Sequence, residues 1–463
     1  MIKFGTDGWR AVIAEDFTFE NVKVVSQAIA DYIKKKYKGK KRVVIGYDRR
    51  FLSREFAQTV GLVLAANNIK VVLSDRDLPT PVVSLHCAHK KYTLGVMITA
   101  SHNPAIFNGL KIKTSEGGSA GEDITKAVED LLFKSKPQFI DLELAKEKKL
   151  LAAEDLTKYY VNFLKSFVNL KKVRSIKLRI LADIMYGSGG KFIREILKPG
   201  KSQVDYLHGE YNPSFGGINP EPIETNLAEM TKIMKKGQYD LGLVLDGDAD
   251  RVALFDSKGN YINAQVILPL LAIHMIKNRG LKGGIGKTVV GSDVIDKVAL
   301  ALKVPCYETP IGFKYLSDLF KKNLICVGGE EAGGIGFKGY IPERDGSAAF
   351  LLLLEMLAVE KKNFSALLAQ FYRTYGHYYY CRTAIPVKNL KKKLSDMKLP
   401  KALYGKKIER INTLDGIKLI TKDCWLMFRK SGTEPIVRIY AESKSQKEAK
   451  DLVALGKKMI YAL

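Results

Sequence analysis

The sequence predicts an α/β protein with three related domains in tandem, followed by a smaller C-terminal α+β domain. The chain has 463 residues, which at roughly 100–200 residues per domain corresponds to three or four domains. A strand, a helix and a second strand recur in this order three times along the chain. After Phe371 the pattern changes to aromatic, strand-like segments, which indicates a last domain of different design.

The first of these units follows an N-terminal helix. We expect this helix over 18–36 with Thr18 as its cap, because apolar residues recur there at helical spacing. These residues are Val22, Val25, Ile29 and Ile33. The unit itself comprises a strand at 43–47, a helix from Ser53 and a strand at 71–73.

The same order is expected twice more. The second occurrence has its strand, helix and strand at 178–183, 192–197 and 204–207. The third has them at 288–292, at 295–302 and from 304. In the last domain we expect strands after the tyrosines at 378–380 and a final helix whose capping box is Ser445 and Glu448.

Domain boundaries follow changes in composition. We place the domains at 1–150, 151–256, 257–371 and 372–463. The charged segment 144–155 is expected to join the first two domains, and the turn-like DSKGN at 256–260 the next two.

Two glycine-rich segments resemble nucleotide-binding motifs without satisfying them. GGIGKT at 283–288 has Leu281 where a P-loop needs its first glycine, and we expect it to precede a strand. Residues 334–339 match GxGxxG, but Pro342 follows where a dinucleotide fold needs a helix. The sequence therefore does not predict a nucleotide site in either place.

The chain is strongly basic. Its formal net charge is +26, which concentrates anions near the surface. Nucleic acid, an acidic membrane or a small phosphorylated metabolite would each satisfy that charge. Lysine runs at 34–36 and 391–393 lack the interleaved aromatic residues typical of single-strand binding.

Cysteine usage and hydropathy favour a cytoplasmic protein without membrane segments. The five cysteines are odd in number and contain no CxxC pair, so neither a disulfide framework nor a zinc site is indicated. The most apolar stretch, 348–359, contains Glu355 and is shorter than the ~20 residues of a bilayer span. The N-terminus lacks the apolar core of a signal peptide.

Three aspartates follow the apolar strand-like LVL of 243–245. Asp246, Asp248 and Asp250 alternate, and carboxylates so close together repel each other unless they share a cation. An EF-hand is excluded because Arg251 occupies the glycine position of that loop. A solvated acidic turn is the other interpretation, and a Mg²⁺ site with open positions is the favoured one.

Two other loops carry polar groups suited to a sugar phosphate. In TASHNP, 99–104, Ser101 is expected on an exposed turn at the end of a strand. In VGGEEAGGIGF, 327–337, two acids are flanked by glycines that permit close backbone approach to a ligand. Such carboxylates accept hydrogen bonds from sugar hydroxyls. Each loop taken alone also fits an ordinary turn.

A fourth loop lies between two strand-like segments in 425–442. It offers guanidinium groups, hydroxyls and an unobstructed backbone N–H, which together suit a phosphate. These come from Arg429, Ser431, Gly432, Thr433 and Arg438. A hairpin with basic flanks is the alternative. If all four loops converge, they form a phosphoryl-transfer site for a phosphorylated polyol.

Five motifs together resemble those of the α-D-phosphohexomutase family, in its phosphoglucomutase/phosphomannomutase branch. They are FGTDGWR, TASHNP, DGDADR, GGEEAGG and RKSGTEP. The resemblance spans the chain and keeps the family's order and spacing. It implies mixed sheets around a central cleft. It also implies a mutase that interconverts hexose 1-phosphate and hexose 6-phosphate through a phosphoserine, with Mg²⁺ and a bound hexose 1,6-bisphosphate.

The resemblance also implies roles for single residues. Ser101 matches the phosphoserine, and Lys111 and Arg10 match catalytic residues. The implied Mg²⁺ ligands are Asp246, Asp248, Asp250 and the phosphorylated Ser101. The implied substrate-binding residues are Glu330, Thr309, Gly312, Lys314, Arg251, Arg429, Ser431, Gly432, Thr433 and Arg438.

The glycine-rich acidic loop at 327–337, which we call the sugar loop, departs from the family pattern at two positions. Ala332 replaces the usual serine, which removes one hydroxyl donor, and Gly334 stands where some relatives have a histidine. Glu331 is closer to the glucose-type pattern than to the glutamine of phosphoglucosamine mutases. We expect glucose phosphates as substrates, with mannose phosphates second.

Two alternatives remain beside this interpretation. Within the same class the alternative is a phosphoglucosamine mutase, and in another class it is a basic nucleic-acid-binding protein. The ordered motifs disfavour the second. The expected partner is a small phosphosugar, with no nucleic acid and no membrane, and the expected assembly is a monomer or a dimer.

Overall fold

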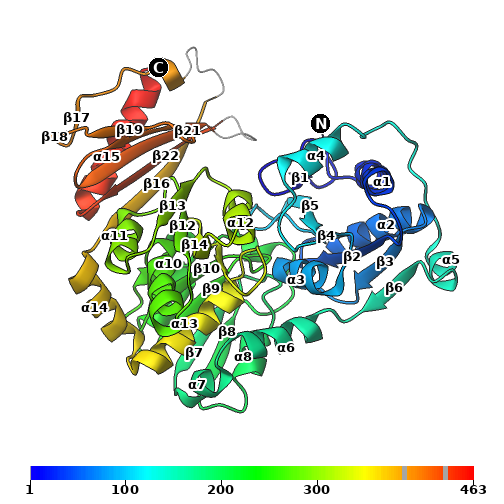
Figure 1. Ribbon diagram of the computed structural model, residues 1–463, viewed down its shortest axis with the longest axis horizontal. Coiled ribbons are helices and arrows are strands. Elements are labelled where there is room, and N and C mark those ends of the chain that lie inside the picture. The colour runs from blue at the N-terminus through cyan, green and yellow to red at the C-terminus, as the bar shows by residue number, and fades with distance from the viewer. Residues whose placement is uncertain (1, 388–393, 431–435) are drawn as a thin grey trace.

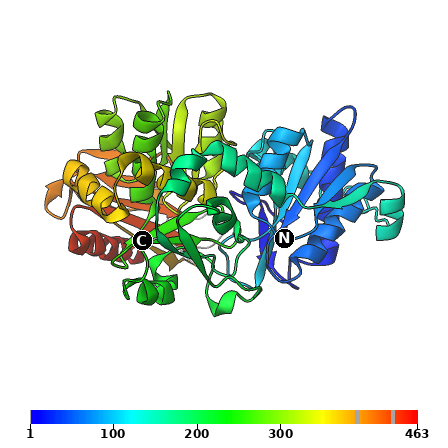
Figure 2. The same ribbon diagram turned by 90° about the horizontal axis from the view of Figure 1, so that it is seen from below.

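The computed structural model describes residues 2–387, 394–430 and 436–463, and these form three mixed α/β domains and a C-terminal domain (Figure 1). Figures 1 and 2 show the first domain (blue to cyan) at one end of the molecule. The last domain (orange to red) lies beside the third at the other end. The predicted fold class is confirmed.

The first domain is a mixed sheet with strand order β1-β5-β4-β2-β3-β6. In that order the strands are Trp9–Val12, Phe107–Thr114, Leu94–Ile98, Arg42–Tyr47, Lys70–Ser74 and Leu151–Glu154. The helices are α1 (Phe19–Lys36), α2 (Ser53–Ala66), α3 (Thr80–Lys90), α4 (Glu122–Glu129) and α5 (Leu142–Glu147). Thr18 caps α1 as predicted, because its side chain accepts a hydrogen bond from the N–H of Asn21.

The segment 144–155 is not a free connection between domains. It contains the end of α5 and then β6, which pairs in parallel with β3 at the edge of the first sheet. Leu151 is buried and packs into the core of the first domain. That apolar anchor outweighs the charged composition that suggested a linker.

The second domain has strand order β11-β10-β9-β7-β8. The strands are Tyr261–Ile262, Val252–Asp256, Leu241–Leu245, Arg179–Asp183 and Gln203–Leu207. The helical segments are α6 (Thr157–Phe167), α7 (Leu170–Ser175), α8 (Phe192–Leu197), η1 (Phe215–Gly217), η2 (Glu224–Asn226) and α9 (Ala228–Met234). The turn at 256–260 forms as predicted, but it joins β10 to β11 within this sheet instead of separating two domains.

The third domain has strand order β13-β12-β14-β15. The strands are Cys306–Thr309, Gly284–Thr288, Ile325–Gly329 and Ile335–Phe337. The helical segments are α10 (Ala264–Ile273), η3 (His274–Asn278), α11 (Asp293–Ala301), α12 (Phe313–Lys321), α13 (Gly346–Glu360) and α14 (Phe364–Tyr375).

The strand predicted at 288–292 is wrong by four residues, because GIGKT itself forms β12 and residues 289–292 form a turn. Glycines permit this close packing: a Cβ on Gly284 would lie 2.4 Å from the carbonyl oxygen of Pro305. The prediction followed the β-branched valines, which instead pack against the last domain.

The C-terminal domain has strand order β16-β22-β21-β20-β19 among its described residues. The strands are Tyr379–Pro386, Ile436–Ser443, Cys424–Lys430, Ile417–Ile420 and Arg410–Asn412. The other elements are η4 (Leu394–Asp396), β17 (Ala402–Leu403), β18 (Lys406–Lys407) and α15 (Gln446–Tyr461). Ser445 precedes α15, but its side chain makes no capping bond, and the hydroxyl of Ser443 donates to Glu448 instead.

Three loops follow the carboxyl ends of central strands. β4 leads into 99–104, β9 into 246–251, and β14 into 330–334. The carboxyl ends of strands are where open α/β sheets bind ligands. A continuous apolar core connects one face of the first sheet with the second and third domains, whereas the last domain has its own core.

Candidate active site

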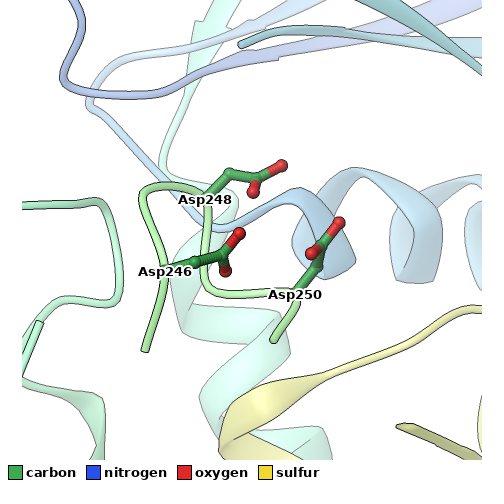
Figure 3. A group of neighbouring side chains, drawn as sticks. All are labelled: Asp246, Asp248 and Asp250. Carbon is green, nitrogen blue, oxygen red and sulfur yellow. The ribbon is translucent and has the colours of Figure 1, made fainter. Parts of the chain in front are cut away.

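Three buried aspartates form the centre of the site. Asp246, Asp248 and Asp250 follow β9, and their carboxylates point toward one another (Figure 3). One oxygen from each lies within 4.8 Å of the other two, and all three residues have no exposed surface. Like charges held so close favour a shared cation over three free carboxylates.

Asp246 joins this cluster to Ser101. Its Oδ2 accepts a hydrogen bond from Ser101 Oγ at 2.9 Å, and its Oδ1 accepts from the N–H of Arg251 at 3.0 Å. Burial, together with the carboxylates of Asp250 and Asp248, holds the pKa of Asp246 well above its usual range. A cation at the cluster would reverse this shift.

Within the part of the chain that the structure describes, the other two aspartates each accept hydrogen bonds through one carboxylate oxygen only. Asp248 Oδ2 accepts from Thr80 Oγ1 at 2.5 Å and from Lys111 Nζ at 2.8 Å, and Asp250 Oδ2 accepts from Lys111 Nζ at 3.2 Å. Among the described residues no hydrogen-bond donor reaches the buried Oδ1 atoms of Asp248 and Asp250. These orphaned oxygens fit a small divalent cation such as Mg²⁺, with outer partners that orient its ligands.

Ser101 sits on a strained turn just after β4. Its φ is +52°, in the left-handed region that β-carbon-bearing residues seldom adopt. Its N–H donates to Thr99 Oγ1 at 2.8 Å. The predicted turn at a strand end is therefore present, but Ser101 is fully buried in this structure and not exposed as expected.

Arg50 braces that turn, and no pattern in the sequence singled it out. Its guanidinium donates to four carbonyl oxygens of the loop at 2.6 to 3.0 Å. These carbonyls belong to Ser101, Asn103, Pro104 and Phe107. In the sequence Arg50 is one of several polar residues that follow an apolar strand. Ordinary solvated turns have the same pattern, so the sequence offers no reason to single it out.

Lys111 and Arg10, to which the resemblance assigns catalytic roles, lie beside the aspartates and the Ser101 loop respectively. Asp7, which was not predicted, lies 2.9 Å from Lys111 Nζ. Arg10 donates to Asn103 Oδ1 at 2.7 Å, beside Ser101. Burial alone would lower the pKa of Lys111, but the carboxylates of Asp248, Asp250 and Asp7 outweigh it and raise that pKa. The ammonium is therefore charged at neutral pH.

Backbone contacts join the sugar loop to the aspartate loop at 246–251 and the start of β10; we call 246–251 the metal loop. The backbone N–H of Val252 donates to the carbonyl of Gly333 at 3.0 Å, and Arg251 forms a bridge with Gly334. Glu330 Oε2 accepts from Arg344 Nη1 at 2.8 Å. Burial raises the pKa of Glu330, although Arg344 opposes that shift. Arg344 was not predicted, because in the sequence it is one charge in a polar turn before an apolar helix.

Four known domain families match successive parts of the chain. They are phosphoglucomutase/phosphomannomutase α/β/α domain I at 1–139, domain II at 158–259, domain III at 263–375 and the C-terminal domain at 383–455. A solved structure from Thermus thermophilus, provisionally named a phosphomannomutase, is 31% identical. It covers 99% of both chains with a TM-score of 0.89. The chain belongs to the phosphoglucomutase/phosphomannomutase family.

Two relatives of this phosphohexomutase carry different substrate names. A phosphoglucomutase/phosphomannomutase of Thermococcus kodakarensis is 29% identical and covers 99% of this chain and 98% of its own length. A phosphoglucosamine/phosphogalactosamine mutase of Sulfurisphaera tokodaii is also 29% identical with the same coverage. Overall similarity therefore does not choose among hexose substrates.

Two further residues expected to bind substrate, Thr309 and Lys314, make their contacts away from the aspartates. Thr309 donates to the carbonyl of its neighbour Pro310 at 3.0 Å, and the ammonium of Lys314 pairs with Glu122 of the first domain at 2.5 Å. Among the residues that the structure describes, neither side chain makes a hydrogen bond or an ion pair with the three aspartates. Gly312 has φ +132°, and a Cβ there would meet Thr6 at 2.8 Å.

The loop between β21 and β22, where the sequence predicts a phosphate cradle, is described only in part. Ser431, Gly432 and Thr433 lie outside the described residues. Arg429 and Arg438 face each other in the register of β21 and β22. Asp415, also not predicted, accepts hydrogen bonds from Arg429 Nε and from the N–H of Ile311, both at 2.9 Å. It thereby links this loop to the third domain.

Proposed function

We propose that this phosphohexomutase interconverts hexose 1-phosphate and hexose 6-phosphate, of glucose first and mannose second, through a phosphoserine at Ser101. One observation carries the proposal: Ser101 Oγ lies 2.9 Å from a buried carboxylate trio in which two oxygens have no donor among the described residues. A hydroxyl beside such an acidic cluster is suited to carry a phosphoryl group that shares a cation with it.

The first transfer moves the phosphoryl group from Ser101 to a sugar hydroxyl. The P–O bond to Ser101 breaks, a P–O bond to the sugar oxygen forms, and the sugar hydroxyl's proton ends on the serine oxygen or a nearby base. Lys111 and Arg10 supply fixed positive charge beside the transferring group. The hexose 1,6-bisphosphate then turns, and its other phosphoryl group returns to Ser101.

The group that the site would hold is Mg²⁺. Its ligands would be Asp246, Asp248, Asp250 and, once phosphorylated, Ser101. When bound, Mg²⁺ supplies neutralisation of the charge that builds on the transferring phosphoryl oxygens. Thr80 and Lys111 orient the carboxylates by hydrogen bonds to their outer oxygens.

The remaining phosphate of the substrate would bind in the last domain. We assign its cradle to Arg429, Ser431, Gly432, Thr433 and Arg438, and the sugar hydroxyls to Glu330 with Arg251 nearby. The partner is thus a small phosphosugar. A cytoplasmic location and a monomeric or dimeric assembly remain predictions. Within the described chain, no helix combines the length and apolar character of a membrane span.

Conversion of glucose 1-phosphate to glucose 6-phosphate, with Mg²⁺ and a trace of glucose 1,6-bisphosphate, tests the proposal. Ser101→Ala should lower kcat by at least about a thousandfold, because the phosphoryl carrier is gone. Ser166→Ala, which changes an exposed serine of α6, should leave kcat unchanged. Normal turnover by Ser101→Ala would refute the assigned nucleophile.

A phosphoglucosamine mutase is the second candidate, and the relative from Sulfurisphaera tokodaii favours it. Parallel measurement of kcat/KM for glucose, mannose and glucosamine 1-phosphates separates the two. We expect glucose to give the highest value, since Glu331 fits the glucose-type pattern. A higher value for glucosamine 1-phosphate would assign the enzyme to the second class.

A further inference from the structure

We propose that Arg344 is a positioning residue that holds Glu330 ready for the sugar, and that Gly334 is required because its missing side chain leaves room for Arg344. The inference rests on the proposed function, in which Glu330 accepts a sugar hydroxyl. Arg344 was not predicted from the sequence, whereas Gly334 was noted only because some relatives have a histidine there.

Arg344 joins carboxylates from three domains at the centre of the cleft. Its Nη1 donates to Glu330 Oε2 at 2.8 Å, and its Nη2 donates to Asp7 Oδ2 at 2.5 Å. Its Nε lies 2.9 Å from Asp250 Oδ2. The side chain is only 5% exposed. A planar guanidinium can reach three carboxylates at fixed angles, which a lysine ammonium cannot do.

The contact with Arg344 decides how Glu330 can bind a sugar. Oε2 of Glu330 is taken by the guanidinium, and within the described part of the chain Oε1 accepts no hydrogen bond. One oxygen is therefore left to accept a sugar hydroxyl. Because Ala332 offers no hydroxyl, we assign recognition of this sugar hydroxyl to the fixed carboxylate of Glu330.

The backbone at Gly334 leaves the space that Arg344 fills. A Cβ at Gly334 would lie 2.4 Å from Arg344 Cδ and 3.3 Å from Glu330 Oε2. Gly334 does not have a positive φ, so alanine fits its backbone and would act only through this steric clash. The absence of a side chain at Gly334 therefore allows Arg344 to occupy its position beside Glu330.

Four variants test the inference: Arg344→Lys, Gly334→Ala, Glu330→Ala and Arg344→Lys combined with Glu330→Ala. We expect Arg344→Lys and Gly334→Ala each to raise KM for glucose 1-phosphate about tenfold while kcat changes less than about threefold. The reason is that a contact made equally in the ground and transition states affects KM alone. The double variant should be no worse than Glu330→Ala.

Two further measurements distinguish positioning from a general structural role. With glucose 1-phosphate analogues that each lack one hydroxyl, one analogue should show the same KM for wild type and Arg344→Lys. Lys338→Met, which removes a charge from the same segment outside the site, should leave KM unchanged. Gly334→Ala retains every charge, so it tests the inference even if Arg344→Lys does not fold.

An unchanged KM in Gly334→Ala would overturn the inference while the proposed function stands. So would a fall in kcat or a shift in the Mg²⁺ concentration for half-maximal activity without a rise in KM, because Arg344 would then act through Asp250. A wild-type enzyme inactive on every hexose phosphate would overturn both proposals.

Discussion

Arg50 shows how one buried guanidinium can define the shape of the loop that carries Ser101. Its hydrogen bonds hold the carbonyls of four residues between Ser101 and Phe107, and Asp48 lies 3.3 Å from its Nε. Its guanidinium also stacks over the ring of Phe215, which belongs to the second domain. The strained φ of Ser101 persists because this network determines the turn around it.

Arg50→Met should therefore lower the free energy of unfolding by about 3–5 kcal/mol, since it leaves the Asp48 carboxylate and several carbonyls buried without their donor. Urea denaturation followed by circular dichroism measures this change. Arg54→Met, at an exposed arginine one turn away, is the matched control. Equal losses in the two variants would contradict the role given to Arg50.

At the scale of elements, His208 connects two strand ends and a helix of the second domain. It follows β8, and its Nδ1 lies 3.0 Å from Asp183 Oδ1 at the end of β7. Its Nε2 lies 3.2 Å from Glu229 Oε2 on α9. Burial would lower the pKa of His208, but the two carboxylates outweigh it and raise that pKa. The loop after β7 supports the metal loop, because Ser188 donates to the carbonyl of Gly247.

The charge on His208 predicts a pH dependence of stability. A raised folded-state pKa means that the stabilisation is fully present below the unfolded value of roughly 6.5 and is lost as pH rises through the folded value. The difference in unfolding free energy between wild type and His208→Gln should therefore be larger at about pH 5.5 than at about pH 9. Denaturant titrations at both pH values measure it, and a difference that grows with pH would contradict this assignment.

At the scale of the whole molecule, an ion pair links the last domain to the second. Arg382 on β16 donates to Glu221 Oε1 at 2.5 Å, and Arg251 of the metal loop lies 3.5 Å from the same oxygen. Val289 and Val290 of the third domain make apolar contacts with Trp425 of the last, and these contacts form part of a second junction. The first contact is partly exposed and charged, whereas the second is buried, so salt should weaken the first more.

Glu221→Gln should let the last domain move away from the second, because the amide lacks the charge that attracts Arg382. Fluorescence energy transfer between labels on these two domains should report a longer mean distance in the variant. In wild type, high salt should move the distance in the same direction. Glu224→Gln, at an exposed neighbour, is the control, and equal distances in wild type and Glu221→Gln would refute the role of this ion pair.

Local patterns predicted some features of the molecule well. Helix α1 and its cap at Thr18 follow from apolar spacing and a single side chain, and the aspartate cluster follows from an apolar strand running into alternating acids. Arg50, Arg344 and Asp7 could not be found in this way. Their partners lie far away in the sequence, and only the folded backbone brings them together. The sequence places β12 four residues too late because glycine has a low β propensity. Close packing against the neighbouring strands favours glycine at these positions, and the sequence alone does not show that packing.

The continuous apolar core of the first three domains has a consequence for turnover. Ser101, the aspartates and Glu330 all stand on that single packed body, while the arginines Arg429 and Arg438 belong to a body with a core of its own. We expect the first three domains to stay packed together while the last domain pivots about its buried apolar contact with the third. Under the proposed function, opening of the last domain would free one end of the bound hexose 1,6-bisphosphate to turn, while Ser101, the aspartates and Glu330 keep their positions.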